Sequence, residues 1–432
     1  MKWSMFIIRV AENKQILLYN TFNSAIVIIE QKEYRYINSN LDNLDLLNKN
    51  IKVLIKEEFL IDKNIDEKQQ FLKALQAEWQ ENKHFCIHIL PTTACNFSCP
   101  YCYQCGIERD YFLDTEKLNK TINYIDNYLE KKEMSWATLI IHGGEPTVYW
   151  EPVIKLLPKI NQVFKKYKVS YNTQIVSNGY NLTKEKIDLL AKYNWNRFQV
   201  TLDGPAYIHD NRRKLKNGMG TFDKIVENIR YAIENNKIKQ VSLRINYDNN
   251  NIKYIPELLK YIKRNFDINR IILSFGFISN TIGDSEANKY VLKHAIDYAD
   301  IKDTYTKLYK IAIDLGFAMD DLFMFDGMCT AKLDNAMVIS ADGNIYKCLS
   351  GVGRKEFVVN TIDSNNYELP NYLFLDLYEQ CLEKQCEFLP LCNTGCRFNA
   401  YLKNKNINSI DCHQEWLKKI NNKLLKIIYF NK

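Results

Sequence analysis

From about Cys86 onward the sequence repeats one local pattern, a short apolar run followed by an amphipathic stretch with helical spacing. The first such stretch, LDTEKLNKTINYIDNYLEK, has Asp114 or Thr115 as its expected cap. Six strand–helix alternations predict a parallel sheet with right-handed crossovers, closed or nearly closed as a barrel. We therefore expect an α/β fold built on a partial (β/α)6 barrel. The strand-like runs are FCIHIL (85–90), ATLII (137–141), YNTQIV (171–176), RFQVTL (197–202), VSLRINY (241–247) and RIILSFGF (270–277).

The segments on either side of this repeat have a different character. Residues 1–82 contain the strand-like runs FIIRV, QILLYNT and SAIVIIE followed by a polar helical region, which predicts a small separate α+β unit. From about residue 326 the helical rhythm gives way to a cysteine-rich tail of short elements. We divide the chain into residues 1–82, 83–325 and 326–432. We also expect the second and third parts to fold without the first, because neither takes a motif from it.

Composition and charge narrow the class of protein. The 432 residues include 46% hydrophobic and 25% charged residues, values that are ordinary for a globular protein and not for a disordered one. The 58 basic and 51 acidic residues are mixed along the same segments, which favours a solvated surface over a nucleic-acid interface. The sequence shows neither a signal peptide nor an apolar stretch of membrane-spanning length. We expect a cytoplasmic protein that binds neither nucleic acid nor membrane.

The twelve cysteines are concentrated in two windows. Because the cytoplasm keeps thiols reduced, metal binding or catalysis is expected rather than disulfides. Cys86 lies outside both windows and is expected to be a small buried core residue. Cys95, Cys99 and Cys102 share one loop after the first strand, where three thiolates can hold three irons of a cubane and leave the fourth open. The alternative is a zinc knuckle closed by Cys105, which is otherwise a bystander thiol.

This loop resembles the cysteine motif of the radical S-adenosylmethionine (SAM) superfamily. The pattern Cx3CxΦC is matched by Cys95, Cys99, Tyr101 and Cys102, with Tyr101 in the aromatic position. The resemblance implies a [4Fe–4S] cluster whose open iron binds the amino and carboxylate groups of SAM. It also implies reductive cleavage of SAM to methionine and a 5′-deoxyadenosyl radical, chemistry that the cofactor carries while the protein orients it.

Motifs at the ends of the following strands extend the resemblance. Gly143-Gly144-Glu145-Pro146 matches the GGEP motif, in which the glycines allow close backbone approach and Glu145 is expected to accept hydrogen bonds from the SAM amino group. Ser177 and Asn178, followed by a glycine, resemble a segment that contacts the SAM ribose and carboxylate.

Four further residues near the strand ends are open to two interpretations. Asp203 and Arg213 resemble positions near the cofactor in related maturases, and a structural ion pair is the alternative. For His142 and His209 we favour packing or hydrogen bonding over a direct role at the site. No catalytic residue is assigned.

The tail resembles the SPASM extension, which binds two auxiliary iron–sulfur clusters, so that three [4Fe–4S] clusters are expected in total. In the family pattern a CxxC pair opens the second part of the extension, so that Cys386 would have a partner cysteine at position 383. This chain has Glu383 at that position, and Cys381 is the nearest thiol. A nearer cluster with three thiolates would leave an iron open to a substrate group, and two structural zinc ions are the alternative. By position, the family pattern assigns Cys329, Cys348 and Cys396 to the nearer cluster, and Cys381, Cys386, Cys392 and Cys412 to the outer one.

The resemblance covers about residues 85–415 and implies a maturase that modifies a ribosomally made peptide by a thioether link, a carbon–carbon crosslink or an oxidation. Residues 1–82 fit a winged-helix-like element that pairs a β-edge with a leader peptide. The implied partners are a precursor peptide, through its leader and core, and a reductase such as flavodoxin or ferredoxin. Anaerobic sulfatase maturases are the alternative, although they tend to have a proton-accepting Asp where this chain has Leu349. A zinc-stabilised binding protein is an alternative of a different class.

Overall fold

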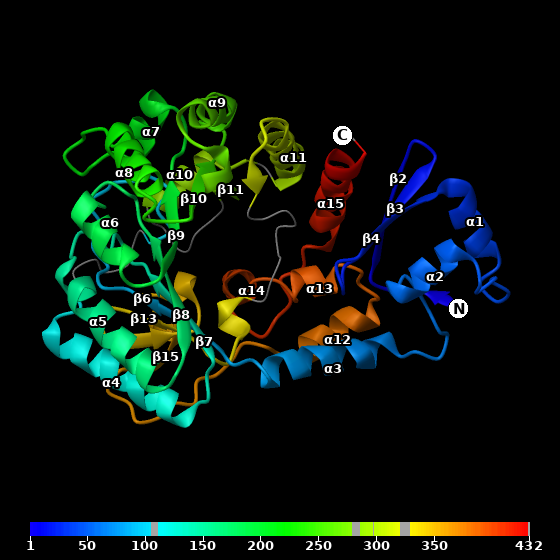
Figure 1. The fold of residues 1–432 in the computed structure, drawn as a ribbon, viewed down its shortest axis with the longest axis horizontal. Helices are drawn as coiled ribbons and strands as arrows, with labels where there is room; N and C mark the ends of the chain where they lie inside the picture. The colour runs from blue at the N-terminus through cyan, green and yellow to red at the C-terminus, as the bar shows by residue number, and fades with distance from the viewer. Residues whose placement is uncertain (105–110, 279–285, 297, 320–328, 431–432) are drawn as a thin grey trace.

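The parallel sheet predicted from the sequence forms the centre of the protein. The computed structural model describes residues 1–104, 111–278, 286–296, 298–319 and 329–430. Within these residues, ten strands join one sheet in the order β12-β11-β10-β9-β8-β7-β6-β13-β14-β15 (Figure 1). Neighbouring strands from β6 to β11 pair in parallel, as the strand–helix alternation predicts. These strands are β6 (His84–Ile89), β7 (Trp136–Ile141), β8 (Ser170–Val176), β9 (Trp195–Thr201), β10 (Gln240–Tyr247) and β11 (Ile271–Phe277).

Helices connect these strands and lie along the outside of the sheet (Figure 1). The first, α4 (Thr115–Lys131), begins where the sequence predicts, because the Asp114 carboxylate accepts a hydrogen bond from the Lys117 backbone nitrogen at 2.9 Å. It buries a stripe that includes Leu118 and Ile125, which fixes the face that packs on the sheet. The helices that follow are α5 (Glu151–Lys166), α6 (Lys184–Ala191), α7 (Ala206–Arg212), α8 (Phe222–Glu234), α9 (Ile255–Asn265), α10 (Glu286–His294) and α11 (Tyr298–Asp314).

The cysteine-rich tail is joined to the barrel through the same sheet. Strand β13 (Ala336–Ile339) pairs in parallel with β6, and β14 (Asn344–Tyr346) and β15 (Val358–Thr361) continue from it in antiparallel pairing. The pairing satisfies backbone groups at the edge of β6 that would otherwise be open. At the other end of the sheet, β12 (Ala318–Met319) pairs with β11. Cys86 in β6 is 6% exposed and belongs to the core, as expected.

The N-terminal residues form a small unit around a three-stranded antiparallel sheet in the order β2-β3-β4. Its own core includes Ile7, Leu18 and Leu54. The unit contains β1 (Lys2–Trp3), β2 (Ile7–Glu12), β3 (Gln15–Asn20), β4 (Ile26–Glu30), α1 (Gln31–Ser39), α2 (Lys49–Lys56), β5 (Leu60–Ile61) and α3 (Glu67–Gln80).

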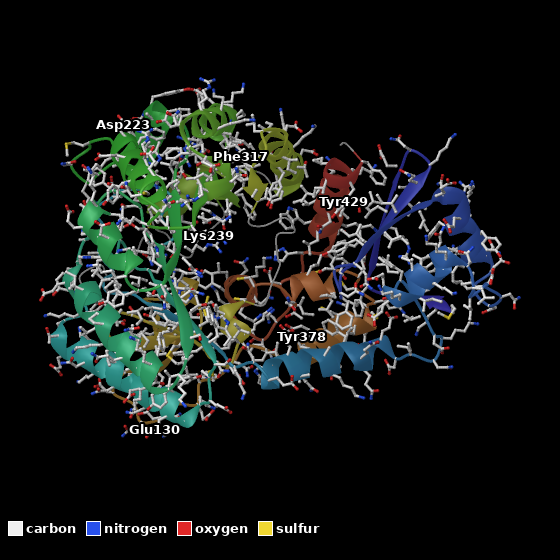
Figure 2. All side chains as sticks on the ribbon, viewed as in Figure 1. Glu130, Asp223, Lys239, Phe317, Tyr378 and Tyr429 are labelled. Carbon is white, nitrogen blue, oxygen red and sulfur yellow. The ribbon has the colours of Figure 1, made fainter. Side chains whose placement is uncertain are left out.

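Helix α3 leaves this unit and packs against α12 (Leu375–Glu383) of the tail (Figure 1). Phe71 of α3 lies 6.2 Å from Tyr378 of α12, measured between ring centroids. Figure 2 labels Tyr378 beside α3. Phe6 and Leu75 complete the N-terminal side of this shared core. The shared core gives reason to expect, contrary to the sequence-based expectation, that the tail depends on residues 1–80 for stability.

The C-terminal helix makes a second connection between the parts. Helix α15 (Gln414–Tyr429) lies between α11 of the barrel and β2 of the N-terminal unit (Figure 1). Trp416 and Leu424 are buried in the main core together with barrel residues, and Lys426 forms an ion pair with Glu12 of β2. The remaining tail helices are α13 (Leu389–Cys392) and α14 (Arg397–Asn404). Among the described helices, none combines the length and apolar character needed to span a membrane.

Candidate functional site

A cavity of about 450 Å³ lies at the C-terminal edge of the parallel sheet. Its volume is within the range of small-molecule sites. Loops that follow parallel strands meet at this edge, which is why sites in such folds form there. The lining residues come from the cysteine loop, from the ends of β7 to β11, and from the tail at Leu349. Two cavities of about 750 and 760 Å³ lie at the N-terminal unit, away from the predicted cofactor ligands.

The three predicted cluster ligands Cys95, Cys99 and Cys102 all line this cavity. Burial raises the pKa of the Cys99 thiol to about 12, with Arg213 opposing the shift and Cys102 and Cys95 adding to it. The three thiols therefore lie close enough for the charge on one to change the pKa of its neighbour. Within the described residues, no three Cys, His, Asp or Glu side chains converge tightly enough to hold one metal ion. A cubane requires no such convergence, because each thiolate binds a different iron. Cys105 lies outside the described residues.

Backbone hydrogen bonds hold the cysteine loop in place. The Ser98 nitrogen donates to the Lys214 carbonyl at 3.0 Å, and the Lys216 nitrogen donates to the Asn96 carbonyl at 3.0 Å. Residues 214–216 follow α7, so the cysteine loop is joined to the segment after this helix. The arrangement fixes the loop across the strand ends before any cofactor is bound.

The two glycines of the GGEP motif lie directly against the start of the cysteine loop. Gly143 has a φ of +153°, and a Cβ on it would lie 2.4 Å from the Thr92 carbonyl oxygen. A Cβ on Gly144 would lie 2.3 Å from the carbonyl oxygens of Thr93 and Ala94. The close approach that the sequence predicts is thus made with the backbone leading into Cys95, which places the loop over β7.

Glu145 is buried and accepts four hydrogen bonds from the protein. Its Oε1 accepts from the Thr147 nitrogen at 3.0 Å, the Thr147 hydroxyl at 2.5 Å and the Ser177 hydroxyl at 2.8 Å. Its Oε2 accepts from the Asn178 nitrogen at 2.6 Å. Burial raises the pKa of this carboxyl, and the hydrogen bonds from Thr147, Asn178 and Ser177 oppose the rise. The residue joins the loops after β7 and β8, and Oε2 has capacity for one more donor.

Ser177 and Asn178 also line the cavity. The Asn178 side-chain nitrogen donates to Asn96 Oδ1 in the cysteine loop at 2.8 Å. Sequence reasoning expected contacts to SAM, and the structure adds contacts from these residues to Glu145 and to the cysteine loop. Pro146 is buried but is absent from the cavity lining within the described residues.

Tyr101 connects Asp203 and Arg213. Its hydroxyl donates to Asp203 Oδ2 and accepts from Arg213 Nη1 at 2.8 Å. Asp203 also accepts from the Asn246 nitrogen at 3.1 Å and has no exposed surface. The sequence left two roles open for Asp203 and Arg213, a position near the cofactor or a structural ion pair. Arg213 lines the cavity, whereas Asp203 is absent from the lining that the structure describes. Their link runs through the Tyr101 hydroxyl rather than through a direct ion pair.

The two histidines differ in their surroundings. His209 is fully buried, and its Nδ1 accepts from the Asp203 nitrogen at 3.2 Å while Nε2 lies 3.1 Å from the Thr221 hydroxyl. This hydrogen-bonding role agrees with the expectation. His142 lines the cavity, and its buried Nδ1 has no hydrogen-bond partner among the described residues. Burial lowers the pKa of His142 to about 4, so the ring is neutral near pH 7.

Sequence reasoning did not single out Arg244, which also lines the cavity. Its guanidinium lies over Gly276 of β11, where a Cβ would come within 2.0 Å of Nη2. Its hydrogen bonds go to the neutral acceptors Asn246 Oδ1 at 3.2 Å and Ser274 Oγ at 2.8 Å. The available signal was a charged residue in the middle of a strand whose alternate positions, Val241, Leu243 and Ile245, are apolar and buried.

The tail cysteines fall into two spatial groups. Burial raises the pKa of Cys348 to about 12, and Cys329 and Cys396 raise it further. Burial also raises the pKa of Cys396, with Cys329 among the further causes. Cys329, Cys348 and Cys396, which we call the nearer group, are therefore brought together. Cys348 directly precedes Leu349 in the lining of the cavity.

The second group contains Cys381, Cys386, Cys392 and Cys412, which we call the outer group. Burial raises the pKa of Cys392 to about 12, Lys332 opposes this, and the other three thiols of the group raise it further. Cys381 is on α12 and half-buried, whereas Glu383 is exposed. The structure thus brings together the same four cysteines that the family pattern assigns to one cluster, with Cys381 in place of position 383.

The tail also buries cations beside these cysteines. Lys332, Lys347 and Arg397 are 2%, 1% and 1% exposed, respectively. Lys347 donates to the carbonyls of residues 333, 334 and 336, and Arg397 donates to the carbonyls of residues 394, 395 and 407. Within the described residues none of the three cations forms an ion pair with a carboxylate. Buried cations next to cysteine thiolates fit an anionic iron–sulfur cluster, which carries the compensating charge.

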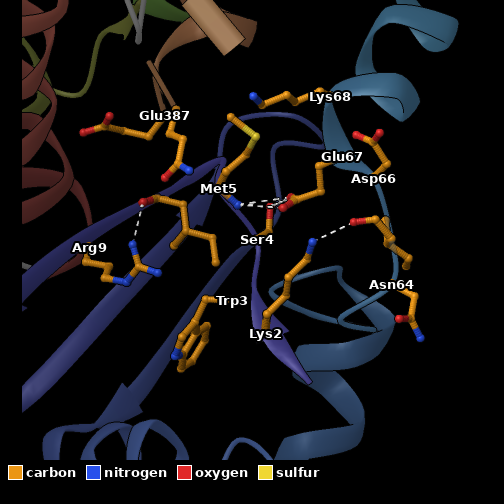
Figure 3. A pocket seen from close by; sticks show the side chains of 13 residues that line it. Lys2, Trp3, Ser4, Met5, Arg9, Asn64, Asp66, Glu67, Lys68 and Glu387 are labelled. Atoms are coloured by element: carbon orange, nitrogen blue, oxygen red, sulfur yellow. Dashed lines mark hydrogen bonds between the residues drawn. The ribbon is translucent and has the colours of Figure 1, made fainter. Parts of the chain in front are cut away.

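The N-terminal unit has two surface cavities. One lies at the contact with the tail, where the Ser4 hydroxyl and the Met5 nitrogen donate to the Glu67 carboxylate and Glu387 completes the wall (Figure 3). The other follows edge strand β4 and helices α1 and α2, and we call it the β4 groove. Ile28, Tyr36 and Val53 of the β4 groove are exposed apolar side chains.

Comparison with known proteins agrees with this geometry. Residues 89–262 match the model of the radical SAM superfamily. The cysteine-type anaerobic sulfatase-maturating enzyme of Clostridium novyi (strain NT) is 26% identical over 343 residues, covering 71% of this chain and 85% of the relative. The serine-type enzyme of Bacteroides thetaiotaomicron is 23% identical over 352 residues, covering 71% of this chain and 81% of the relative.

Solved structures share the fold. Native anSMEcpe with bound AdoMet and Kp18Cys peptide superposes with a TM-score of 0.63 at 18% identity, covering 80% of this chain and 99% of that chain. Streptococcus suis SuiB bound to S-adenosylmethionine superposes with a TM-score of 0.55 at 17% identity, covering 95% and 98%. SuiB bound to the precursor peptide SuiA gives the same TM-score of 0.55. The solved structures thus share the fold, and the match of residues 89–262 to the family model shows that the chain carries a radical SAM domain.

Proposed function

We propose that the protein is a radical SAM enzyme that modifies a ribosomally made precursor peptide. The observation that carries the proposal is the cavity at the strand ends, where Cys95, Cys99 and Cys102 share one lining with Ser177 and Asn178. A cluster held by these three thiolates would supply, with SAM, a 5′-deoxyadenosyl radical for hydrogen abstraction. The chain's own part is to bind and orient the reactants and to exclude water.

Individual residues have distinct roles in this proposal. Glu145 Oε2 has capacity to accept from the SAM ammonium, while Oε1 is occupied by Thr147 and Ser177. Arg244 presents a guanidinium to the cavity without a carboxylate partner among the described residues, and can bind a carbonyl or carboxylate of a reactant. The neutral His142 ring offers a hydrogen-bonding nitrogen toward the same region. These residues orient reactants; none is assigned a proton-transfer step.

The tail would hold two auxiliary clusters, one in each cysteine group. The nearer group has three cysteines and adjoins the cavity through Leu349, so an iron there is suited to bind a substrate group. The outer group has four cysteines and would hold a fully ligated cluster for electron transfer. A reductase such as flavodoxin or ferredoxin would supply the electron that starts each turnover.

The peptide substrate is supported by the neighbours and by the N-terminal unit. Among the similar structures, anSMEcpe is bound to the Kp18Cys peptide and SuiB to its precursor peptide SuiA. The β4 groove combines an edge strand with exposed apolar side chains, the features that an extended leader peptide would use by adding a strand. We propose that the leader binds there while the core peptide reaches the cavity, which raises the local concentration of the reacting segment.

Sulfatase maturation is the second candidate, favoured by the names of the similar curated proteins. Leu349 argues against it. This side chain lines the cavity where sulfatase maturases tend to have a proton-accepting Asp, and an alkyl group accepts no proton.

The two candidates are separated by one experiment. The anaerobically reconstituted protein is incubated with SAM, dithionite and either a cysteine-type sulfatase peptide or a precursor peptide encoded beside its gene. We expect a mass change in the precursor peptide alone. Formylglycine in the sulfatase peptide, detected with a hydrazine probe, would favour the second candidate. A Leu349→Asp variant tests the same residue directly, since gain of formylglycine formation would identify it as the determinant.

A further inference from the structure

Lys332 lies close enough to cysteines of both tail groups to interact with their charge, namely Cys329 and Cys396 of the nearer group and Cys392 of the outer group. It ends a short 3-10 helix that follows Cys329 directly, and its side chain is buried. Its ammonium donates to the carbonyl of Asn393, which is in the loop joining Cys392 of the outer group to Cys396 of the nearer group. One buried cation is therefore adjacent to both groups.

The hydrogen bonding of Lys332 is incomplete. An ammonium has three N–H donors. Lys347 uses its donors on three carbonyls, those of Leu333, Asp334 and Ala336. Lys332 has one carbonyl acceptor among the described residues, and the Tyr378 ring lies 6.0 Å from its Nζ. Two donors of a buried ammonium are thus left without an acceptor among the described residues.

No carboxylate in the described part of the tail neutralises this charge. The fully buried acid of the region, Asp411, is occupied by His413 at 2.7 Å and by Lys403. Arg397, a second buried cation, donates to the Thr394 and Gly395 carbonyls of the same loop and adds positive charge. Burying cations without an anion is strongly unfavourable. A thiolate-ligated cluster held by these cysteines would supply a compensating negative charge beside Lys332 and Arg397.

We propose that Lys332 is the counter-cation of the auxiliary clusters and raises their reduction potentials. The inference rests on the proposed function, in which the two cysteine groups hold such clusters. Adding one electron makes a thiolate-ligated cluster more negative, so a buried cation beside it stabilises the reduced form more than the oxidised form. A higher potential makes the clusters better acceptors for an electron that leaves the substrate. Lys332 is a positioning and charge-compensating residue, and not a catalytic one.

The test is a potentiometric titration of the auxiliary clusters followed by electron paramagnetic resonance. The full-length reconstituted protein is measured with its native Cys95, Cys99 and Cys102, and again with all three changed to Ala so that only auxiliary signals remain. Three variants are compared in both backgrounds. Lys332→Met removes the charge, Lys332→Arg keeps it, and Lys405→Met removes an exposed charge from the same domain.

We expect Lys332→Met to shift the one-electron reduction equilibrium of at least one auxiliary cluster about tenfold toward the oxidised form, which is about 59 mV. Lys332→Arg and Lys405→Met should shift it less than about threefold. An unchanged potential in Lys332→Met protein with full iron content would overturn the proposal. If Lys332→Met loses iron, retention of iron by Lys332→Arg supports the role of the charge, and equal loss in both overturns it. If the wild-type protein holds iron for only one cluster, the proposed auxiliary clusters are refuted. The proposed role of Lys332 is then refuted as well.

Discussion

The hydroxyl of Tyr101 donates a hydrogen bond to the carboxylate of Asp203, and so joins the cysteine loop to the end of β9. Both residues are buried, and Arg213 Nη1 donates to the same hydroxyl at 2.8 Å. The aromatic position of the cysteine motif therefore has a specific buried partner on the loop that follows β9. The contact explains how one side chain keeps three thiols over the strand ends before a cluster is assembled.

Tyr101→Phe should destabilise the protein while leaving its four-iron site able to assemble. Losing the hydroxyl leaves Arg213 and Asp203 without their shared partner in a buried position, at a cost of about 1–3 kcal/mol. The measurement is denaturant unfolding of the reconstituted protein under anaerobic conditions. Tyr103→Phe is the matched control from the same loop and should change the free energy of unfolding little. Equal stability of the Tyr101→Phe variant and wild type would contradict the assigned role.

Changing Cys95, Cys99 and Cys102 together to Ala should remove about four irons and leave about eight, a count that follows from one lost and two retained cubanes. Formation of 5′-deoxyadenosine with SAM and dithionite should cease. Iron and zinc are counted by mass spectrometry after anaerobic purification. Zinc in place of iron would favour the binding-protein alternative, and continued SAM cleavage would exclude these cysteines as the site.

Glu145→Ala should affect both stability and SAM affinity. Four donated hydrogen bonds are lost with the carboxylate, and each buried donor left without a partner costs about 1–3 kcal/mol. Loss of the acceptor for the SAM ammonium should weaken SAM binding about tenfold to a hundredfold. Glu145→Gln is the informative partner variant because it keeps the shape of the side chain. Unfolding and equilibrium SAM binding separate the two effects, and unchanged SAM affinity in both variants would limit Glu145 to a structural role.

The folded protein should lose stability as the pH falls below neutrality, partly through His142. Burial lowers the pKa of His142 to about 4 from 6.5, so the unfolded chain takes up a proton that the folded chain does not. The contribution of His142 to the free energy of unfolding is fully present above pH 6.5 and is lost progressively as the pH falls to about 4. Between pH 7 and 5.5 the loss is about 1 kcal/mol. His142→Gln should reduce the pH dependence by that amount in unfolding measurements, and an unaltered pH profile would show that the ring is solvated.

The β4 groove should be needed for the precursor peptide and not for SAM cleavage. Replacing Ile28 and Tyr36 by Ala removes exposed apolar contacts on the groove without touching the cavity. We expect KM for the full-length precursor to rise about tenfold or more, as is typical when interface anchors are lost. Formation of 5′-deoxyadenosine without peptide should be unchanged. Ile154→Ala on the exposed face of α5 is the control, and equal KM values for the two variants would remove the groove from the mechanism.

The local features of this protein could be predicted from its sequence. Short runs enriched in apolar residues mark β6 to β11, and helices repeat their apolar residues every three or four positions. These strands and the cap at Asp114 were therefore identifiable. The resemblance of the tail to a known family pattern also implied a grouping of its cysteines, which stays a prediction. Such patterns are visible because they depend on neighbours in the chain.

Contacts between distant residues were decided by the tertiary structure. Residues two apart on a helix point about 200° apart, so the packing of α12 leaves Cys381 half-buried and Glu383 exposed. The four donors to Glu145, the position of Arg244 over Gly276 and the packing of α3 on α12 likewise join separate elements. Sequence periodicity gives the face that an element buries. Which element packs against that buried face depends on the arrangement of all the elements, and only the folded chain specifies this arrangement.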